Sequence, residues 1–249
     1  MGYFSQDDIQ ALCGDNSRLK SEIQARFLTI HKKVFEQLHI NDIELNIIKP
    51  SEKAVHADTV SRHKNKNDDK VLSVQYMRSR SQAVTIERLM GREEIASANN
   101  LIVRLHPVIE VRLSENGLTV ELIISPDAWW DQENLKGKLS ISRHRYEFYT
   151  LLMTLEDAYI MGFWEGVHQS DMHLAGKYFQ HPRILDEWLS TFNTNSDWFR
   201  LGVWYALDDE ALAEDQITAT IVEQVRALYP VYLYFLWTSG NNYREFNNT

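Results

Sequence analysis

Cysteine, proline and glycine are scarce in this sequence. Cys13 is the single cysteine among 249 residues, which also include only five prolines and ten glycines. One cysteine cannot form an internal disulfide, so a disulfide-stapled secreted scaffold is excluded and a reducing cytosol is favoured. The scarcity of proline and glycine predicts that long helices and strands outweigh loops.

Long hydrophobic runs are also missing. The most apolar stretch, Leu228 to Trp237, is well short of the roughly 18 apolar residues that a membrane-spanning helix needs, and it contains Pro230. The first residues, MGYFSQDDIQ, are acidic and lack the apolar core of a signal peptide. We therefore expect a cytoplasmic protein that does not enter a membrane.

Positive charge is in the minority. The chain has 26 Lys and Arg against 35 Asp and Glu, which gives a net charge of −9. Such a surface disfavours general binding to nucleic acid or to anionic lipid. Apolar residues make up 44% and charged residues 24%, which is typical of a globular protein and unlike a disordered chain. The many aromatic residues leave a homo-oligomer open, because exposed rings can form an interface.

Apolar residues at steps of three and four predict several helices. The longest begins after Asp15-Asn16-Ser17 and has one apolar stripe: Leu19, Ile23, Phe27, Ile30, Val34 and Leu38. The same spacing predicts helices over 143–155, 182–192 and 215–228. Pro230 is expected to kink or interrupt the last of them, because proline lacks a backbone N–H.

Alternating apolar and polar residues predict strands. In the clearest case, 108–124, two alternating runs flank Asn116-Gly117, a pair preferred in type I′ hairpin turns. One face of this hairpin is apolar, and the other is expected to be solvated or to face a polar cleft; it carries Glu110, Arg112, Thr119 and Glu121. Further strands are expected at 43–48, 71–77, 158–164 and 198–207, whereas 83–90 fits either a strand or a helix.

The order of these elements favours an α+β fold with a mainly antiparallel sheet covered by helices, because there is no regular βαβ rhythm and no internal repeat. The region 50–70 includes SRHKNKNDDK, which has no apolar residue and predicts an exposed, flexible loop. The parts on either side of this loop look too small or too open to fold alone. We therefore expect a single domain over 1–249.

Four residues that bind metals or move protons lie in the stretch GFWEGVHQSDMH: Glu165, His168, Asp171 and His173. Imidazole and carboxylate groups suit zinc, iron or manganese, and an irregular loop could gather all four around one ion. Glu110 and Glu121 would then be candidates for a general base, which gives a metal-dependent hydrolase. The spacing is not HExxH and matches no established metal signature, so a polar loop after a strand is the other interpretation.

Positive charge is concentrated in one segment, 62–80. It contains Arg62, Lys64, Lys66, Lys70, Arg78 and Arg80, opposed only by Asp68 and Asp69. Such a segment could bind phosphate or another anionic partner, with an affinity that falls steeply as salt is added. A solvated loop followed by the polar face of a strand explains the same pattern.

The stretch PDAWWDQENLKGK, residues 126–138, has the residue types of a nuclease signature in which two carboxylates hold Mg²⁺ and a lysine stabilises the attacking water. Its second half, Glu133 to Lys136, is one residue too long for that signature and is expected on a helix. Ser125-Pro126-Asp127 is typical of a helix start. A capped helix with Trp129 and Trp130 partly buried therefore fits better.

Known nucleotide-binding signatures and the GxSxG nucleophile elbow are absent from the sequence. Because every catalytic signature fails on spacing or context, a binding or interaction module is the favoured hypothesis. The metal-dependent hydrolase is the alternative. The partner is unknown, and so is any cofactor apart from the divalent metal of that alternative.

Overall fold

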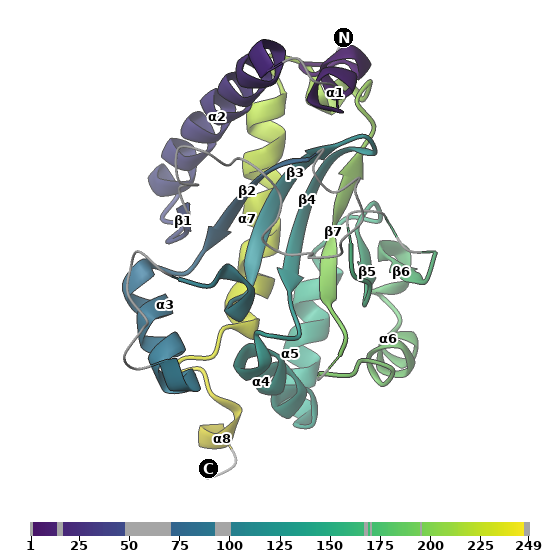
Figure 1. The fold of residues 1–249 in the computed structure, drawn as a ribbon. Coiled ribbons are helices and arrows are strands. Elements are labelled where there is room, and N and C mark those ends of the chain that lie inside the picture. Colours follow the sequence, from purple (N-terminus) through teal and green to yellow (C-terminus); the bar gives the residue numbers. More distant parts are fainter. Residues whose placement is uncertain are drawn as a thin grey trace.

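The centre of the structure is a seven-stranded sheet with the order β1-β2-β3-β4-β7-β5-β6 (Figure 1). The computed structural model describes residues 2–13, 17–47, 71–92, 101–166, 169, 171–194 and 196–246. Every pairing among the described strands is antiparallel. The strands are β1 (Asn46–Ile47), β2 (Leu72–Met77), β3 (Val108–Ser114), β4 (Gly117–Ile124), β5 (Ile160–Gly162), β6 (His173–Ala175) and β7 (Phe199–Tyr205). The predicted α+β fold with an antiparallel sheet is confirmed.

Helices pack on one face of this sheet. The helix α7 (Ile217–Phe235) crosses β3 and β4, and α2 (Ser17–Ile40) lies beside it (Figure 1). The other helices are α1 (Gln6–Cys13), α3 (Arg80–Glu87), α4 (Trp129–Leu139), α5 (Ser142–Met153), α6 (Pro182–Leu189) and α8 (Tyr243–Phe246). A π-helical turn, Arg88–Arg92, follows α3 directly. None of the described helices has the length and apolar character needed to cross a membrane.

The hydrophobic core lies between the sheet and these helices. Alternate strand residues face it, including Ile109, Val111 and Leu113 of β3. The predicted stripe of α2 enters the same core, except that Leu19 is 42% exposed. One continuous cluster of buried side chains therefore runs from Phe4 to Leu236.

A buried histidine in this core predicts a dependence of stability on pH. His31 of α2 shares a 2.5 Å hydrogen bond between its Nδ1 and the Tyr76 hydroxyl of β2, and burial lowers the pKa of His31 to about 3. Below pH 6.5 the His31 side chain is protonated in the unfolded chain but stays neutral in the folded chain. The contribution of His31 to the free energy of unfolding is therefore fully present above pH 6.5 and is lost progressively as the pH drops towards 3. The slope from His31 approaches about 1.4 kcal/mol per pH unit.

Urea unfolding between pH 7 and pH 4.5 measures this slope. His31→Asn is expected to reduce the measured slope to the part that His106, whose pKa is also lowered to about 3, still contributes, whereas the same change at the exposed His181 is expected to leave it as in the wild type. Equal slopes in the wild type and His31→Asn would show that His31 titrates alike in the folded and unfolded chains.

The hairpin at 108–124 is confirmed, but its turn lies one residue earlier than predicted. Ser114 pairs with Gly117, so Glu115 and Asn116 form the turn. Neither has a positive φ, whereas Gly117 has a φ of 108°, and the type I′ prediction is therefore wrong. A Cβ at Gly117 would also clash with the Tyr205 carbonyl oxygen of β7. Gly117 is therefore required both by the backbone conformation at the turn and by the close approach of β7.

The predicted interruption at Pro230 is also wrong. The helix α7 continues through Pro230 to Phe235, which makes the aromatic segment part of the helix. Tyr232, Tyr234 and Phe235 are buried, and the Phe235 ring lies 4.6 Å from the ring of Phe199 on β7. Burial of these rings outweighs the backbone hydrogen bond that proline cannot make.

Several boundaries differ from the predicted ones. The ambiguous segment 83–90 is helical, because Ser79 and Gln82 form a capping box at the start of α3. The strand expected at 43–48 is described only as the short β1. The expected flexible loop at 50–70 lies outside the described residues.

Candidate functional site

The face of the sheet opposite the helices carries charged side chains at its centre. Glu110 and Arg112 of β3, Glu121 of β4 and Arg200 of β7 alternate with core residues and so project from this face. All four are at most 3% exposed. The hairpin's polar face is therefore buried, which corrects the expectation that it is solvated.

Hydrogen bonds join these side chains into one sheet network, made up of Gln75, Glu110, Arg112, Glu121 and Arg200. Arg112 Nη2 and Arg200 Nη2 both donate to Glu121 Oε2, the former at 2.9 Å. Arg112 Nη1 donates to Glu110 Oε1, and Gln75 Nε2 donates to Glu110 Oε2, each at 2.9 Å. The chain of bonds crosses the sheet from β2 to β7.

The sheet network balances two arginines against two glutamates in a region of low dielectric. Burial alone would raise the pKa of the Glu121 carboxyl, but Arg200 and Arg112 hold this pKa below its ordinary value. A carboxylate whose pKa is lowered is a weaker base. The geometry therefore favours a structural role for Glu121, and the general-base role of Glu110 and Glu121 stays a prediction.

A glycine makes room for the carboxylate at the centre of the sheet network. Gly202 of β7 lies directly opposite Glu121 in the register of the two strands. A Cβ at Gly202 would come within 2.5 Å of Glu121 Cγ and would clash with the Val120 carbonyl oxygen. Because Gly202 has no side chain, the Glu121 side chain can extend over β7 to reach Arg200.

The stretch GFWEGVHQSDMH begins on β5 and is attached to the sheet network by Arg200. The guanidinium lies over the Trp164 ring, 4.8 Å from its centroid, and donates a hydrogen bond to the Gly166 carbonyl oxygen. Gly162 lies opposite Arg200, and the Trp164 ring occupies the space that a Cβ at Gly162 would need. Arg200, Gln75 and Trp164 were not among the predicted site residues.

The predicted metal ligands lie in and just after this attached loop. Glu165 and Asp171 are exposed, His173 is half-buried at the start of β6, and His168 lies outside the described residues. Gln169 Nε2 lies 3.4 Å from His173 Nε2, within reach of a hydrogen bond to the ring. In the described part of the chain, no three His, Cys, Asp or Glu side chains are grouped to hold a metal. The site that includes His168 stays a prediction.

The basic segment is described only at its end. Arg62, Lys64, Lys66 and Lys70 lie outside the described residues, while Arg80 is exposed at the first turn of α3. Arg78 is 3% exposed, and its Nη2 forms a 2.5 Å ion pair with Asp131 Oδ1 of α4. Arg78 Nη1 donates to the Trp237 carbonyl oxygen at 3.3 Å, and Trp237 N donates to Asp131 Oδ1 at 2.7 Å.

The nuclease-like stretch forms the helix α4, as expected, but the helix begins at Trp129 after the N-cap residue Ala128, which makes no side-chain cap, so the start predicted at Ser125-Pro126-Asp127 is wrong. One buried face of α4 holds the end of α7. Asn134 Nδ2 donates to the Phe235 carbonyl oxygen at 3.2 Å, and Lys138 Nζ donates to the Tyr234 carbonyl oxygen at 2.8 Å. Burial lowers the pKa of Lys138 to about 8. These polar groups satisfy carbonyl oxygens that the end of a helix leaves free, which is a structural role.

A groove with a volume of about 380 Å³ lies between α3 and the segment that follows α7, and we call it the α3 groove. Figure 1 shows where α3 and the end of α7 lie in the fold. Its lining residues come from the end of β2, from α3 with the turn after it, and from 236–239: Arg78, Ser81, Gln82, Thr85, Ile86, Leu89, Leu236, Trp237, Thr238 and Ser239. Within the described part of the chain, Arg78 is the only ionisable group that lines the groove.

The described segment that includes α3 and the turn after it is rich in arginine. Residues 78–92 contain four arginines and one acid, Glu87, although the whole chain has a net charge of −9. Glu87 is buried and paired with Arg92, and it accepts a hydrogen bond from Ile102 N at 2.6 Å. Burial, then Arg78, lowers the pKa of the neighbouring His106 to about 3, so His106 stays neutral. No negative charge within this segment faces the groove.

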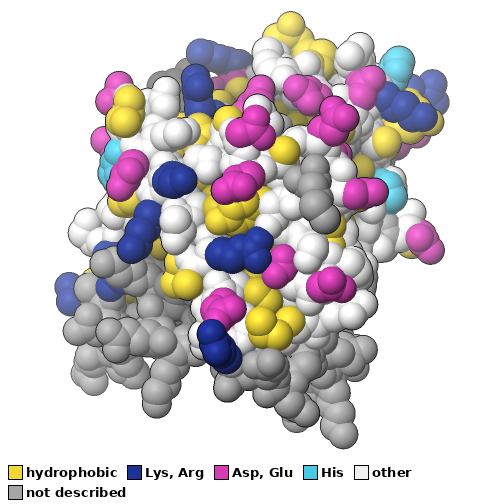
Figure 2. Space-filling model, turned by 90° about the horizontal axis from the view of Figure 1, so that it is seen from above, with side chains coloured by type: hydrophobic (Ala, Val, Ile, Leu, Met, Phe, Trp, Pro, Cys, Tyr) yellow, Lys and Arg dark blue, Asp and Glu magenta, His cyan; other side chains and the backbone are white. Residues whose placement is uncertain are grey.

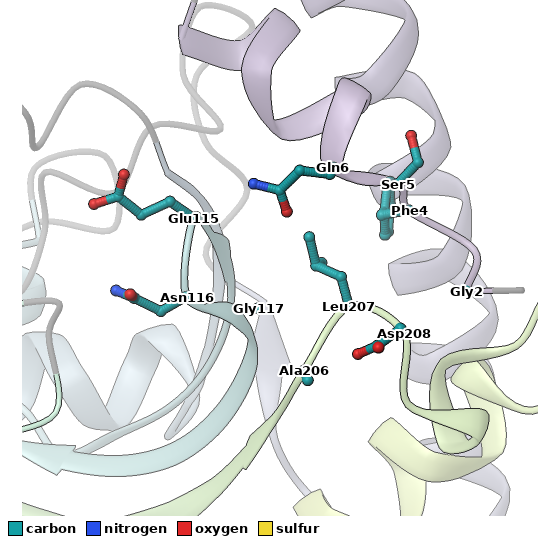
Figure 3. Close-up of a pocket in the computed structure, with 10 residues that line it drawn as sticks. All are labelled: Gly2, Phe4, Ser5, Gln6, Glu115, Asn116, Gly117, Ala206, Leu207 and Asp208. Carbon is teal, nitrogen blue, oxygen red and sulfur yellow. The ribbon is translucent and has the colours of Figure 1, made fainter.

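The opposite end of the molecule is acidic and holds a second pocket, of about 540 Å³. The side chains of Gln6 and Leu207 extend into the space between the start of α1 and the hairpin turn (Figure 3). The segments that meet here, 2–13, 114–117 and 205–216, contain eight acids and no Lys or Arg. Asp and Glu side chains are spread over this end, with Lys and Arg between some of them (Figure 2). Its charge favours cations, in contrast to the α3 groove.

The sequence matches no protein-family model, and no curated protein is significantly similar to it. Relatives therefore supply no activity that could be transferred to either pocket. The function has to be inferred from the side chains and their geometry.

Proposed function

We propose that this protein is a binding module that takes an anionic ligand in the α3 groove. The observation that carries the proposal is that Arg78 is the only ionisable residue among the described residues that line the groove. An arginine keeps its proton at all ordinary pH values, so it attracts an anion but does not act as a general acid or base. The lining chemistry supports binding over catalysis.

One wall of the α3 groove is held in place by a buried ion pair and the other by a helix cap. Asp131 fixes both Arg78 and the backbone of Trp237, which places the guanidinium against the 236–239 wall. On the other side, the capping box of Ser79 and Gln82 fixes the first turn of α3. A site that is formed before the ligand arrives loses less entropy on binding.

A groove-filling substitution tests the proposal. Thr85 is exposed on the α3 wall, and its Oγ1 donates to the carbonyl oxygen four residues earlier at 3.0 Å. Thr150 of α5 is also exposed and makes the same 3.0 Å bond, so Thr150→Trp is a matched control for Thr85→Trp. Ligand-observed NMR with a mixed panel of small anionic and cationic organic molecules is the measurement.

Anionic members of the panel are expected to bind the wild type and Thr150→Trp and to lose at least tenfold in affinity for Thr85→Trp. Equal binding to both variants, binding of the cations alone, or no binding by any member would overturn the proposal. The free energy of unfolding of each variant shows whether Thr85→Trp leaves the fold intact.

A further inference from the structure

The α3 wall of the groove changes from polar to apolar along its length. Ser81, Thr85 and Leu89 follow one another at steps of four, so they line one row of the helical wall. The row is about 12 Å long at 1.5 Å per residue. It starts with a hydroxyl next to Arg78 and ends with Leu89, which is 52% exposed.

The apolar part is larger than Leu89 alone. Ile86 of α3 and Leu236 of the opposite wall are buried below it and line the same groove. Trp237 is half-buried, and its ring lies 4.4 Å from the ring of Trp130 in an edge-to-face contact. The exposed Leu89 and the apolar residues below it form a surface that an alkyl or aryl group of a ligand would cover.

The polar part suits a single negative charge. One guanidinium lines the groove, and Asp131 offsets its charge, so the polar part lacks the excess positive charge with which clusters of arginines bind dianionic phosphates. Among the described residues, no acceptor is within reach of the buried Arg78 Nε. Arg78 Nη1 and Nη2 already donate to the Trp237 carbonyl oxygen and to Asp131, so Nε is the donor left for one oxygen of a carboxylate. The N-terminal end of α3 adds a favourable dipole at the same end of the groove.

From these observations we infer that the ligand is an amphiphilic carboxylate. Its head group lies at Arg78 and Ser81, and its apolar chain or ring runs along the α3 wall of the groove to Leu89. This inference rests on the proposed function, because it names the chemical class of the anion that the α3 groove binds.

Calorimetric titration of the full chain with octanoate, acetate and octylammonium, each below its micelle concentration, tests the inference. Octanoate has both parts of the expected ligand, acetate has the head alone, and octylammonium has the chain with the opposite charge. Octanoate is expected to bind at least tenfold more tightly than acetate, because each buried methylene contributes about 0.8 kcal/mol. Octylammonium is expected not to bind.

Variants of the exposed Leu89 test whether the ligand lies in the groove, and they leave every buried residue unchanged. Leu89→Glu is expected to weaken octanoate binding at least tenfold, whereas Leu89→Lys is expected to retain it. Leu28 is 37% exposed on α2, so Leu28→Glu is the control for an added charge elsewhere and is expected to bind like the wild type.

The outcomes separate this inference from the proposed function. If acetate binds as tightly as octanoate and Thr85→Trp weakens both, the groove binds anions but the apolar part of the inference is wrong. If Leu89→Glu binds octanoate like the wild type, the assigned position of the chain is wrong. If Thr85→Trp affects no anion, the proposed function fails together with the inference.

Discussion

Glu121→Gln is expected to lower the free energy of unfolding by about 3–5 kcal/mol, because it removes one partner from a buried ion pair network. The substitution keeps the shape of the side chain but leaves Arg200 without a carboxylate and Arg112 with Glu110 alone. Urea unfolding with tryptophan fluorescence measures the loss. Glu187→Gln is the control, because Glu187 pairs with Arg183 on the surface, where such pairs contribute about 0.2–1 kcal/mol.

A second variant separates charge from packing in the same network. Glu121→Leu combined with Arg200→Met removes one charge of each sign and leaves the pair of Arg112 and Glu110 balanced. This double variant is expected to be more stable than Glu121→Gln, since apolar side chains of similar volume replace buried ion pairs at little cost. A double variant less stable than Glu121→Gln would show that the hydrogen bonds of the network matter more than its charge balance.

Local patterns were sufficient to predict most of the helices and strands. The stripe of α2 and the alternation of β3 and β4 each depend on residues close in sequence, so their periods reveal the buried side. The tight turn was misplaced, because Gly117 is required partly by contact with Tyr205, which is far away along the chain. The continuation of α7 through Pro230 likewise depends on the tertiary burial of the rings that follow it.

The sheet network could be predicted only in part. Alternation placed Glu110, Arg112 and Glu121 on one face of the hairpin, which the structure confirms. Arg200 alternates with apolar residues in the same way, but nothing local shows that β7 pairs with β4 and brings Arg200 to Glu121, 79 positions away. The polar pattern was therefore interpreted as contact with solvent or with a cleft, because the compensating charge lies on a strand that is distant in sequence.

The α3 groove could not be predicted from the sequence either, because it also depends on contacts between residues that are distant in sequence. Arg78 stood out in the sequence as part of a basic segment, and its charge predicted an exposed position. Its partner Asp131 lies 53 positions away on α4, and Trp237 lies further still. Only the assembled fold shows that this arginine is buried and that hydroxyl and apolar side chains line a groove beside it.

Asp131→Ala is expected to destabilise the fold by about 3–5 kcal/mol, because it leaves the buried Arg78 guanidinium without its counter-charge. It also removes the acceptor of the Trp237 N–H, which adds the cost of an unpaired buried donor. Asp131→Asn keeps an oxygen at that position and is expected to lose less.

Asp127→Asn is the control at the same end of α4, since Asp127 forms a partly exposed pair with Arg104 and its loss is expected to stay below about 1 kcal/mol. Urea unfolding gives these values, and ring contacts of Trp237 make the native tryptophan fluorescence a second readout. Equal losses for Asp131→Ala and Asp127→Asn would mean that Arg78 is not held by Asp131, and the wall of the α3 groove would then lack the rigidity that binding requires.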